Sequence, residues 1–365
     1  MVNAPSCPGL IARRRIALDL LKVPESSVRF SIAPALQKIV NGRRALDIAG
    51  FLAESLTAER CGWFAAYTGE KHTGDTSYTT NPILTCALGL AKTERLTFAT
   101  GVSVLPVHHP VALAEDACLL DGMFPGRFRL TTGAGYFSGD YEPFGVSLDE
   151  RQLRMDVGMD VIAAHRAGKP MDVPHPWAGK VPPRDPALGK DRLEVFIGAW
   201  SPAGVRRAAR DADGWVTDPI RSGRWIQRLT DVYREECAKL GKAPRIVLFR
   251  EAWIDKSDAA ARETYGPHVL GYSRVYFVRG NAFNERYDPW LKNVKSPEQL
   301  TLDNVLEDRV LCGSAQTWVD QIGRWKEALQ PEEMLIRMRH YQGPELARTL
   351  EAIERVTADV IPQLR

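Results

Sequence analysis

Residues 68–72 bring together three side chains that can transfer protons, because Glu70, Lys71 and His72 follow one another there. A carboxylate, an ammonium group and an imidazole can each serve in general acid or base catalysis. The same residue types are common in solvated loops, so a loop without a catalytic role is the alternative. The segment lacks HExxH-type spacing and is not obviously paired with a second group of ligands, so we expect no bound metal.

Two further segments have features of anion-binding sites. Residues 131–135 read Thr-Thr-Gly-Ala-Gly, whose small side chains would let backbone amides approach an anion, although a plain tight turn is the alternative. Ser201 and Pro202 fit the N-cap and the first position of a helix, and a helix N-terminus attracts phosphate. The Ser-Pro pair is also a routine capping signal in helices that bind nothing.

Two adjacent histidines, His108 and His109, precede Pro110. Neighbouring residues on an extended chain point in opposite directions. We therefore expect a loop that enters a helix rather than a pair of ligands.

The elements that position these residues form a repeated pattern. Short runs rich in Val, Ile, Phe and Tyr alternate with amphipathic stretches, which is typical of βα units around a parallel sheet. Eight units predict a closed (β/α)8 TIM barrel of the α/β class. An open doubly wound sheet is the alternative, but its glycine fingerprint after the first strand is absent. The predicted strands are residues 28–34, 62–68, 96–102, 128–132, 193–198, 214–218, 246–253 and 333–338. The predicted helices include residues 45–60, 110–123, 150–166, 222–240, 315–328 and 344–361.

Residues 28–365 are expected to form one barrel domain, preceded by an extension at residues 1–27. The proline-rich residues 168–190 predict a long surface connection. Residues 266–308 carry aromatic side chains without clear periodicity and predict a lid or an insertion. Barrel enzymes place their working residues at the C-terminal ends of the strands.

Composition excludes several classes of protein. The net charge of +3 and the lack of a large basic cluster give no reason to expect nucleic acid. No apolar run approaches the length of a membrane span, and Asp19 and Lys22 interrupt the early apolar stretch that resembles a signal peptide. The six cysteines form no CxxC pair, which is typical of a cytoplasmic protein with free thiols.

From residue 28 to the C-terminus the sequence resembles the bacterial-luciferase family of flavin and deazaflavin oxidoreductases, and particularly its luciferase-like monooxygenase branch. The similar segments follow in order along the chain. They are residues 62–72, Asn81-Pro82, Leu105-Pro106, His109-Pro110, residues 114–116, Leu120-Asp121, residues 126–128, Phe144-Gly145, residues 201–214, Gly313 and the closing helix at residues 359–362.

The resemblance implies a barrel that holds reduced FMN at its mouth, where the flavin reacts with molecular oxygen and an organic substrate is oxygenated. It implies a non-prolyl cis peptide between Gly101 and Val102, and it places Ser201 at the flavin phosphate. Glu70, Lys71 and His72 occupy the catalytic segment. The residues expected beside the cofactor are Gly101, Val102, Gly133, Ala134, Tyr136, Phe137, Trp200 and Ser201.

The sequence departs from the luciferase pattern at three of these positions. Lys71 replaces the acid/base histidine, and an ammonium group with an ordinary pKa near 10.4 is no base at neutral pH. Ala134 replaces a phosphate-binding arginine, and Gly133 replaces a reactive cysteine near the flavin. Backbone amides around residues 133–136, together with Ser201, would then have to hold the phosphate.

Three functions are consistent with the resemblance. The first is a two-component FMN-dependent monooxygenase supplied with reduced flavin by a separate reductase. The second is a deazaflavin-dependent oxidoreductase, and the third is a non-catalytic partner subunit, for which Lys71 and Ala134 are the reasons.

The resemblance also implies a homodimer that pairs through the helical segments at residues 81–90 and 110–123. An apolar mouth would suit a hydrophobic or aromatic substrate, such as one of specialised metabolism, with residues 266–308 closing over it. Five aromatic residues at or just after predicted strand ends could line this mouth, and core packing explains them equally well: Tyr67, Tyr136, Phe137, Trp200 and Trp215.

Overall fold

The computed structural model describes residues 28–72, 79–280 and 282–364, so the predicted extension at residues 1–27 lies outside it. Within these residues, eight parallel strands close into a barrel, because the last strand in the order, β7, pairs with the first, β10. Each predicted strand has a counterpart, which confirms the (β/α)8 prediction. In barrel order the strands are β10 (Glu194–Gly198), β11 (Gly214–Val216), β12 (Ile246–Ile254), β14 (Glu333–Arg337), β1 (Arg29–Ile32), β4 (Ala65–Thr68), β5 (Thr97–Thr100) and β7 (Phe128–Gly133).

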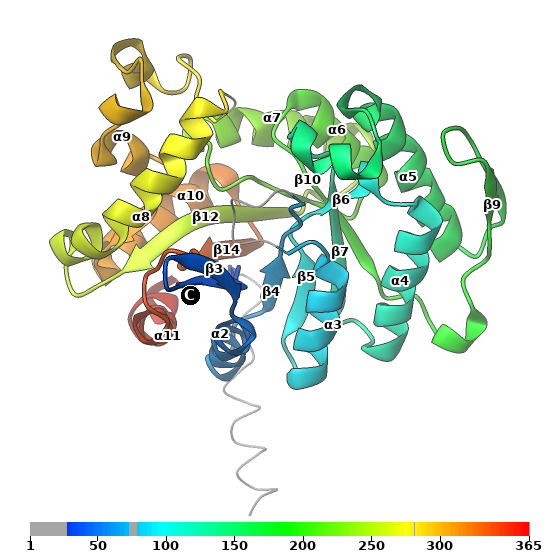
Figure 1. Ribbon diagram of the computed structural model, residues 1–365, viewed down its shortest axis with the longest axis horizontal. Coiled ribbons are helices and arrows are strands. Elements are labelled where there is room, and N and C mark those ends of the chain that lie inside the picture. Colours follow the sequence, from blue (N-terminus) through cyan, green and yellow to red (C-terminus); the bar gives the residue numbers. More distant parts are fainter. Residues whose placement is uncertain (1–27, 73–78, 281, 365) are drawn as a thin grey trace, which may run out of the picture.

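Helices surround the barrel strands (Figure 1). They begin where the sequence supplies caps: Asn81 accepts a hydrogen bond from Leu84 N at 3.0 Å and is followed by proline at the first helical position. The helices are α2 (Ile48–Arg60), α3 (Pro82–Lys92), α4 (Pro110–Met123), α5 (Arg151–Arg166), α6 (Pro202–Asp211), α7 (Gly223–Lys239), α8 (Asp258–Val278), α9 (Leu302–Leu306), α10 (Ala315–Leu329) and α11 (Leu346–Arg355). None of the helices among the described residues is long and apolar enough to cross a bilayer.

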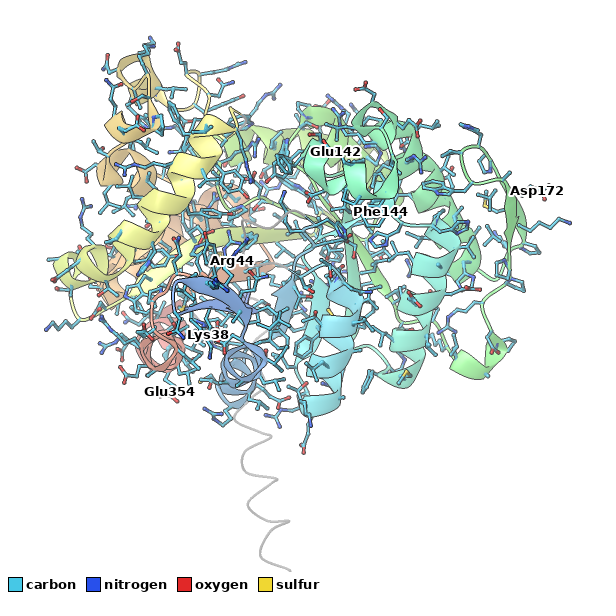
Figure 2. The ribbon with its side chains drawn as sticks, in the orientation of Figure 1. Lys38, Arg44, Glu142, Phe144, Asp172 and Glu354 are labelled. Carbon is cyan, nitrogen blue, oxygen red and sulfur yellow. The ribbon has the colours of Figure 1, made fainter. Side chains whose placement is uncertain are left out.

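A β-hairpin occupies the start of the helix predicted from residue 45. Strands β2 (Gln37–Val40) and β3 (Arg43–Leu46) pair antiparallel, and the helix begins only at Ile48. Asn41 and Gly42 turn the chain with φ values of 49° and 74°, which the type I′ hairpin turn requires at both central positions. Figure 2 shows the Lys38 and Arg44 side chains of this hairpin.

Three other segments differ from the prediction in detail. Residues 266–308 begin inside helix α8, which continues through Pro267, and only their second part is an irregular excursion that carries α9. Residues 168–190 contain a second hairpin, β8 (Met171–Val173) with β9 (Gly179–Val181), which lies at the edge of the molecule in Figures 1 and 2. The closing helix leaves α geometry after Arg355 and continues as a π turn over Val356–Val360.

A buried group of charged residues fills the N-terminal half of the barrel. Arg129, on β7, lies 2.9 Å from Glu333 Oε2 and 2.7 Å from Glu194 Oε2, and it donates to the Tyr67 hydroxyl at 2.6 Å. Glu194 and Glu333 open their strands, so the group, here called the basal cluster, closes the bottom of the barrel. Among the described residues, the space for a ligand within the barrel therefore lies toward the C-terminal ends of the strands.

Replacing Arg129 with Ala should lower the free energy of unfolding by about 3–5 kcal/mol, because it removes the cation 2.9 Å from the buried Glu333 carboxylate and leaves Arg29, 3.8 Å away, as its remaining partner among the described residues. Urea denaturation followed by circular dichroism measures this. Glu235→Ala on the exposed face of α7 is the control and should change stability by less than about 0.5 kcal/mol. Equal effects of the two substitutions would contradict a stabilising role for the basal cluster.

Candidate active site

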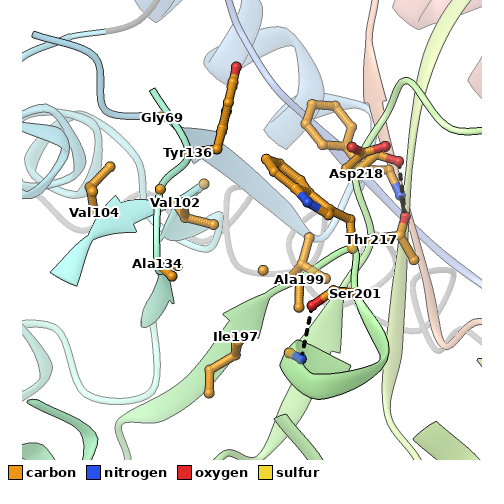
Figure 3. Close-up of a pocket in the computed structure, with 18 of the residues that line it drawn as sticks. Gly69, Val102, Val104, Ala134, Tyr136, Ile197, Ala199, Ser201, Thr217 and Asp218 are labelled. Carbon is orange, nitrogen blue, oxygen red and sulfur yellow. Dashed lines mark hydrogen bonds between the residues drawn. The ribbon is translucent and has the colours of Figure 1, made fainter. Parts of the chain in front are cut away.

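A cavity of about 390 Å³ opens at the C-terminal ends of the barrel strands, a size typical of small-molecule sites. Figure 3 shows Ala134 and Tyr136 following β7, Ile197 on β10, Ser201 at the start of α6, and Val102 beyond β5. The predicted site residues that line the cavity are Glu70, Lys71, Gly101, Val102, Gly133, Ala134, Tyr136, Trp200 and Ser201. His72 and Phe137 are not on its wall but contact residues that are.

Glu70 is the buried carboxylate of the site, with 6% of its surface exposed. The Nε2 atoms of His72 and His108 lie 2.6 and 2.8 Å from Glu70 Oε1, and Val104 N donates to Oε2 at 2.9 Å. An ionised carboxylate only accepts hydrogen bonds, so both imidazoles donate through Nε2. Burial opposes ionisation, but the hydrogen bonds from His108 and His72 outweigh it and hold the pKa of Glu70 below its usual value. Glu70 is therefore a carboxylate that can hold a proton-bearing imidazole on either side.

His108 is a site residue that the sequence prediction missed. The two adjacent histidines do point apart, since the ring of His109 faces Trp177 while His108 reaches Glu70. Helix α4 starts directly after them at Pro110, as predicted. The missing information was the distance between the loops after β4 and β5, which no local pattern encodes.

Lys71 is buried in an ion pair with Asp140. Its Nζ lies 2.8 Å from Asp140 Oδ2, and His72 N donates to the other oxygen, Oδ1, at 3.0 Å. The same ammonium group lies 4.1 Å from the centre of the Phe137 ring, a cation–π arrangement. Asp140, which the sequence prediction also missed, thus ties the loop after β7 to the loop after β4. The ion pair holds the Lys71 side chain at the wall of the cavity, at the position where the luciferase pattern has an imidazole.

The peptide between Gly101 and Val102 is cis, as the resemblance led us to expect. Val102 projects between two glycines, and a Cβ atom added at Gly133 or Gly198 would lie 2.9 or 2.6 Å from its methyl groups. Gly133 is the last residue of β7 rather than part of a free turn. Because Gly133 and Gly198 lack side chains, there is room for Val102 between them. These three residues form an apolar surface in the cavity, here called the Val102 cradle.

Ser201 caps helix α6 as predicted, because its Oγ accepts a hydrogen bond from Gly204 N at 3.1 Å (Figure 3). The positive end of the helix dipole therefore faces the cavity. The sequence prediction did not single out three other polar residues of this wall, Arg151, Gln152 and Arg207. These three residues, together with Ser201 and Gly204, are here called the polar end of the cavity.

Another part of the wall is aromatic and includes two tyrosines of helix α8. Tyr136, Tyr272 and Tyr276 line it with Phe249 of β12, and the hydroxyl groups of Tyr136 and Tyr276 are 3.1 Å apart. The edge of Tyr136 also meets the Trp200 ring, with 4.8 Å between the ring centres. These residues form the apolar end of the cavity, and helix α8, which begins ahead of the predicted lid, covers it.

A buried charge network supports Tyr272 from behind. Arg337 donates to its hydroxyl at 2.7 Å and is itself paired with Glu251. Burial opposes ionisation of Glu251, but Arg337 and His340 outweigh it and lower the pKa of Glu251 to about 2. The network therefore fixes one aromatic wall of the cavity.

Two aromatic residues predicted at the mouth lie elsewhere. Tyr67 points into the barrel, where its hydroxyl belongs to the basal cluster. Trp215 points outward, packs on Tyr233 of α7 and donates to Ala199 O at 2.9 Å. For both residues the structure favours core packing, which was the alternative explanation, because alternation along a strand decides which face a side chain occupies.

Comparison with known proteins agrees with this geometry. The model of the luciferase-like monooxygenase family matches residues 33–330. The chain belongs to the luciferase-like monooxygenase family. It is therefore an oxidoreductase of that family, as the resemblance implied. Among the described residues, no group of three or more His, Cys, Asp or Glu side chains is placed to hold a metal ion.

Relatives of the chain include named monooxygenases. The oxygenase component of flavin-dependent trigonelline monooxygenase from Acinetobacter baylyi is 21% identical over 366 residues, covering 92% of this chain and 95% of that protein. Limonene 1,2-monooxygenase from Rhodococcus erythropolis is 29% identical over a shorter stretch of 119 residues, 33% of this chain and 31% of that protein.

Solved structures share the fold at low sequence identity. The oxygenating constituent of 3,6-diketocamphane monooxygenase from Pseudomonas putida was solved in complex with FMN. It has a TM-score of 0.75 at 18% identity, over 93% of this chain and 99% of that one. An F420-dependent secondary alcohol dehydrogenase has a TM-score of 0.72 at 15% identity, again over 93% and 99% of the two chains. The fold is thus shared by enzymes named for FMN and for a deazaflavin.

Glu70→Gln should lower stability at neutral pH by about 1–3 kcal/mol, because the buried acceptor loses its charge. The pKa of Glu70 is lowered in the folded protein, so its contribution is complete above the unfolded pKa near 4.5 and is lost as the pH falls through the folded value. Urea denaturation from about pH 6 to pH 3 should therefore show a steeper loss for the wild type than for Glu70→Gln. Glu327→Gln, an exposed change on α10, should keep the wild-type slope, and a Glu70→Gln slope equal to that of the wild type would contradict the assignment.

Proposed function

We propose that this chain is the oxygenase component of a two-component FMN-dependent monooxygenase. It would receive reduced FMN from a separate reductase and use molecular oxygen to oxygenate a hydrophobic or aromatic organic substrate. The observation that carries the proposal is one cavity whose wall combines the polar end, aromatic residues and the Val102 cradle. The relative named as the oxygenase component of a flavin-dependent monooxygenase supports the two-component arrangement.

The residues present fit a flavin mononucleotide. The polar end offers a helix N-terminus, the Ser201 hydroxyl and the guanidinium groups of Arg151 and Arg207, which is a suitable donor set for a phosphate. The cradle around Val102, where a Cβ on either glycine would collide with its methyl groups, offers an apolar surface for a flat ring. When bound, reduced FMN would supply the electrons that activate oxygen.

The protein's own groups would bind, orient and exclude water. The aromatic residues Tyr136, Tyr272 and Tyr276 would hold the substrate against the ring and keep bulk water out. Glu70 would keep His72 and His108 in position to hold or release a proton beside the cavity. Lys71 would contribute a fixed positive charge rather than a base, since Asp140 is its partner. Residues 266–308, which include the covering part of α8, would shape access to the apolar end.

Anaerobic titration with photoreduced FMN, beside a parallel titration with F420, tests the cofactor. We expect reduced FMN to bind and its reoxidation by oxygen to change in the presence of the protein. Ala134→Trp, which places an indole at the cavity wall, should abolish binding, whereas Ala167→Trp on the exposed end of α5 should not. Binding of F420 alone would favour the deazaflavin alternative, and binding of neither cofactor would favour a non-catalytic partner subunit.

We also propose that the chain forms a homodimer through α3 and α4. These helices pack side by side and expose Leu84, Leu119 and Met123 by 68%, 48% and 59%. Large apolar side chains gathered on one face mark interaction surfaces. A symmetric pair would bury this face against its copy.

Leu84→Glu combined with Leu119→Glu should convert the dimer to a monomer, because it places charges in the apolar face. Light scattering coupled to size exclusion measures the mass. Leu240→Glu, at a leucine that is 44% exposed at the end of α7, is the control and should leave a dimer. A wild-type protein that is monomeric at micromolar concentration would rule out this proposal.

A further inference from the structure

Four consecutive residues that follow strand β11, residues 218–221, line the cavity and are here called the β11 wall. Arg221 pairs with Asp218, and its guanidinium carbon lies 4.5 and 4.6 Å from the ring centres of Trp200 and Trp225. A cation held between two aromatic rings fixes both rings against it. Because Trp200 also lines the cavity, the position of the β11 wall decides where its indole ring lies.

The middle of the β11 wall packs against the apolar end of the cavity. Ile220 belongs to a buried cluster with Tyr276 and Ala282, and both of these residues line the cavity. Behind it, Arg309 Nε donates to the Ile220 carbonyl at 2.8 Å, and the charge of Arg309 is balanced by its ion pair with Asp288.

Arg250, on strand β12, contacts both ends of the β11 wall from outside the barrel. Neighbouring side chains on a strand point to opposite faces, and Phe249 lines the cavity. Arg250 therefore points toward the helices, where its guanidinium carbon lies 4.9 Å from the centre of the Trp325 ring. From there its Nη1 donates to the carbonyl oxygens of Arg221 at 3.2 Å and Asp218 at 3.4 Å.

Arg250 occupies an environment that is unfavourable for a cation. It is fully buried, and within residues 28–72, 79–280 and 282–364 no carboxylate lies within ion-pair distance of it. Its Nε and Nη2 atoms have no hydrogen-bond partner among these residues. Burial lowers the pKa of Arg250 to about 10, since the charges of Asp308 and Asp218 offset only part of the effect. A buried cation of this kind lowers stability, so its contacts with the β11 wall are the gain that the structure shows for it.

We propose that Arg250 is a positioning residue that holds the β11 wall, and through it the Trp200 ring, in place at the substrate end of the cavity. The proposal rests on the proposed function, which it deepens by assigning what keeps the apolar end in shape. Arg250 acts through the backbone of the wall and touches neither flavin nor substrate. The position of the wall is thus maintained at the expense of stability.

Replacing Arg250 with Met separates this role from a purely structural one. Methionine fills similar space without a charge, so the melting temperature should stay the same or rise. Amide hydrogen exchange of residues 217–222, read by mass spectrometry, should become at least about tenfold faster because two carbonyl contacts are lost. Arg250→Lys keeps a donor and should restore part of the protection.

Two further variants complete the comparison. Arg309→Met should lower the melting temperature, because it leaves Asp288 buried without its cation. Arg324→Met, an exposed change beside Trp325 on α10, is the matched control and should change neither the melting temperature nor the exchange. A lower melting temperature of Arg250→Met with faster exchange along the whole chain would overturn the proposal, as would unchanged exchange at residues 217–222.

Ligand binding tests the consequence for the cavity, with 2-naphthol as an aromatic probe and reduced FMN as the cofactor. In a calorimetric titration with reduced FMN present, Arg250→Met should bind 2-naphthol on the order of tenfold more weakly than the wild type and Arg324→Met do. Equal affinities of Arg250→Met and the wild type for 2-naphthol would also overturn the proposal. If the wild type binds neither reduced FMN nor 2-naphthol, the proposed function fails, and the exchange and melting measurements still decide the role of Arg250.

Discussion

The basal cluster is the interaction on which the site depends most. A parallel barrel of eight strands has an interior that side chains must fill, and here Arg129, Tyr67, Glu194 and Glu333 fill its N-terminal half. Because these charges are paired and buried, that half has no room for a ligand. The residues beyond the strand ends can then be small, as at Gly101, Gly133 and Gly198, and the cavity forms above them.

The loops around the cavity are joined to one another rather than only to their own strands. Asp140, in the loop after β7, pairs with Lys71 after β4, and Glu70 accepts hydrogen bonds from Val104 and His108 beyond β5. Phe144 of the same β7 loop, labelled in Figure 2, packs edge-on against His72. Because Glu70, Lys71 and Asp140 are buried, a change in one loop should alter the conformation of the others. Lys71 therefore has a structural role in addition to whatever charge it presents to a ligand.

The sequence was most informative where burial alone decides the structure. All eight strands were predicted, because β12, for example, is buried along its whole length and reads as a continuous apolar stretch apart from two charged residues. Helix α4 has the predicted bounds because proline marks its start. The β2–β3 hairpin was missed although Asn41-Gly42 is a strong local signal for a type I′ turn, so this error could have been avoided. For Tyr67 and Trp215, the pattern identified strand residues but not which face of the barrel wall each would occupy.

The site was predictable only in part for a different reason. Ser201 and the Gly101–Val102 peptide could be located from the family pattern, whereas His108, Asp140 and Arg151 lie in other loops and helices and reach the site through the closure of the barrel. No local pattern in a single sequence predicts such contacts between residues that are distant along the chain. Arg151 illustrates this. Its place at the cavity wall, and the lack of a carboxylate near it among the described residues, depend on how the folded helices pack and not on the residues next to it in the sequence.

The central claim is that one cavity holds FMN with its phosphate at the polar end and its ring over the Val102 cradle. A crystal structure of the protein soaked or grown with FMN tests this most directly. The account predicts the phosphate within hydrogen-bond distance of Ser201 and Arg151, and the ring beside the Gly101–Val102 peptide with the aromatic wall left for substrate. Phosphate density at another position, or a flavin bound outside this cavity, would contradict it.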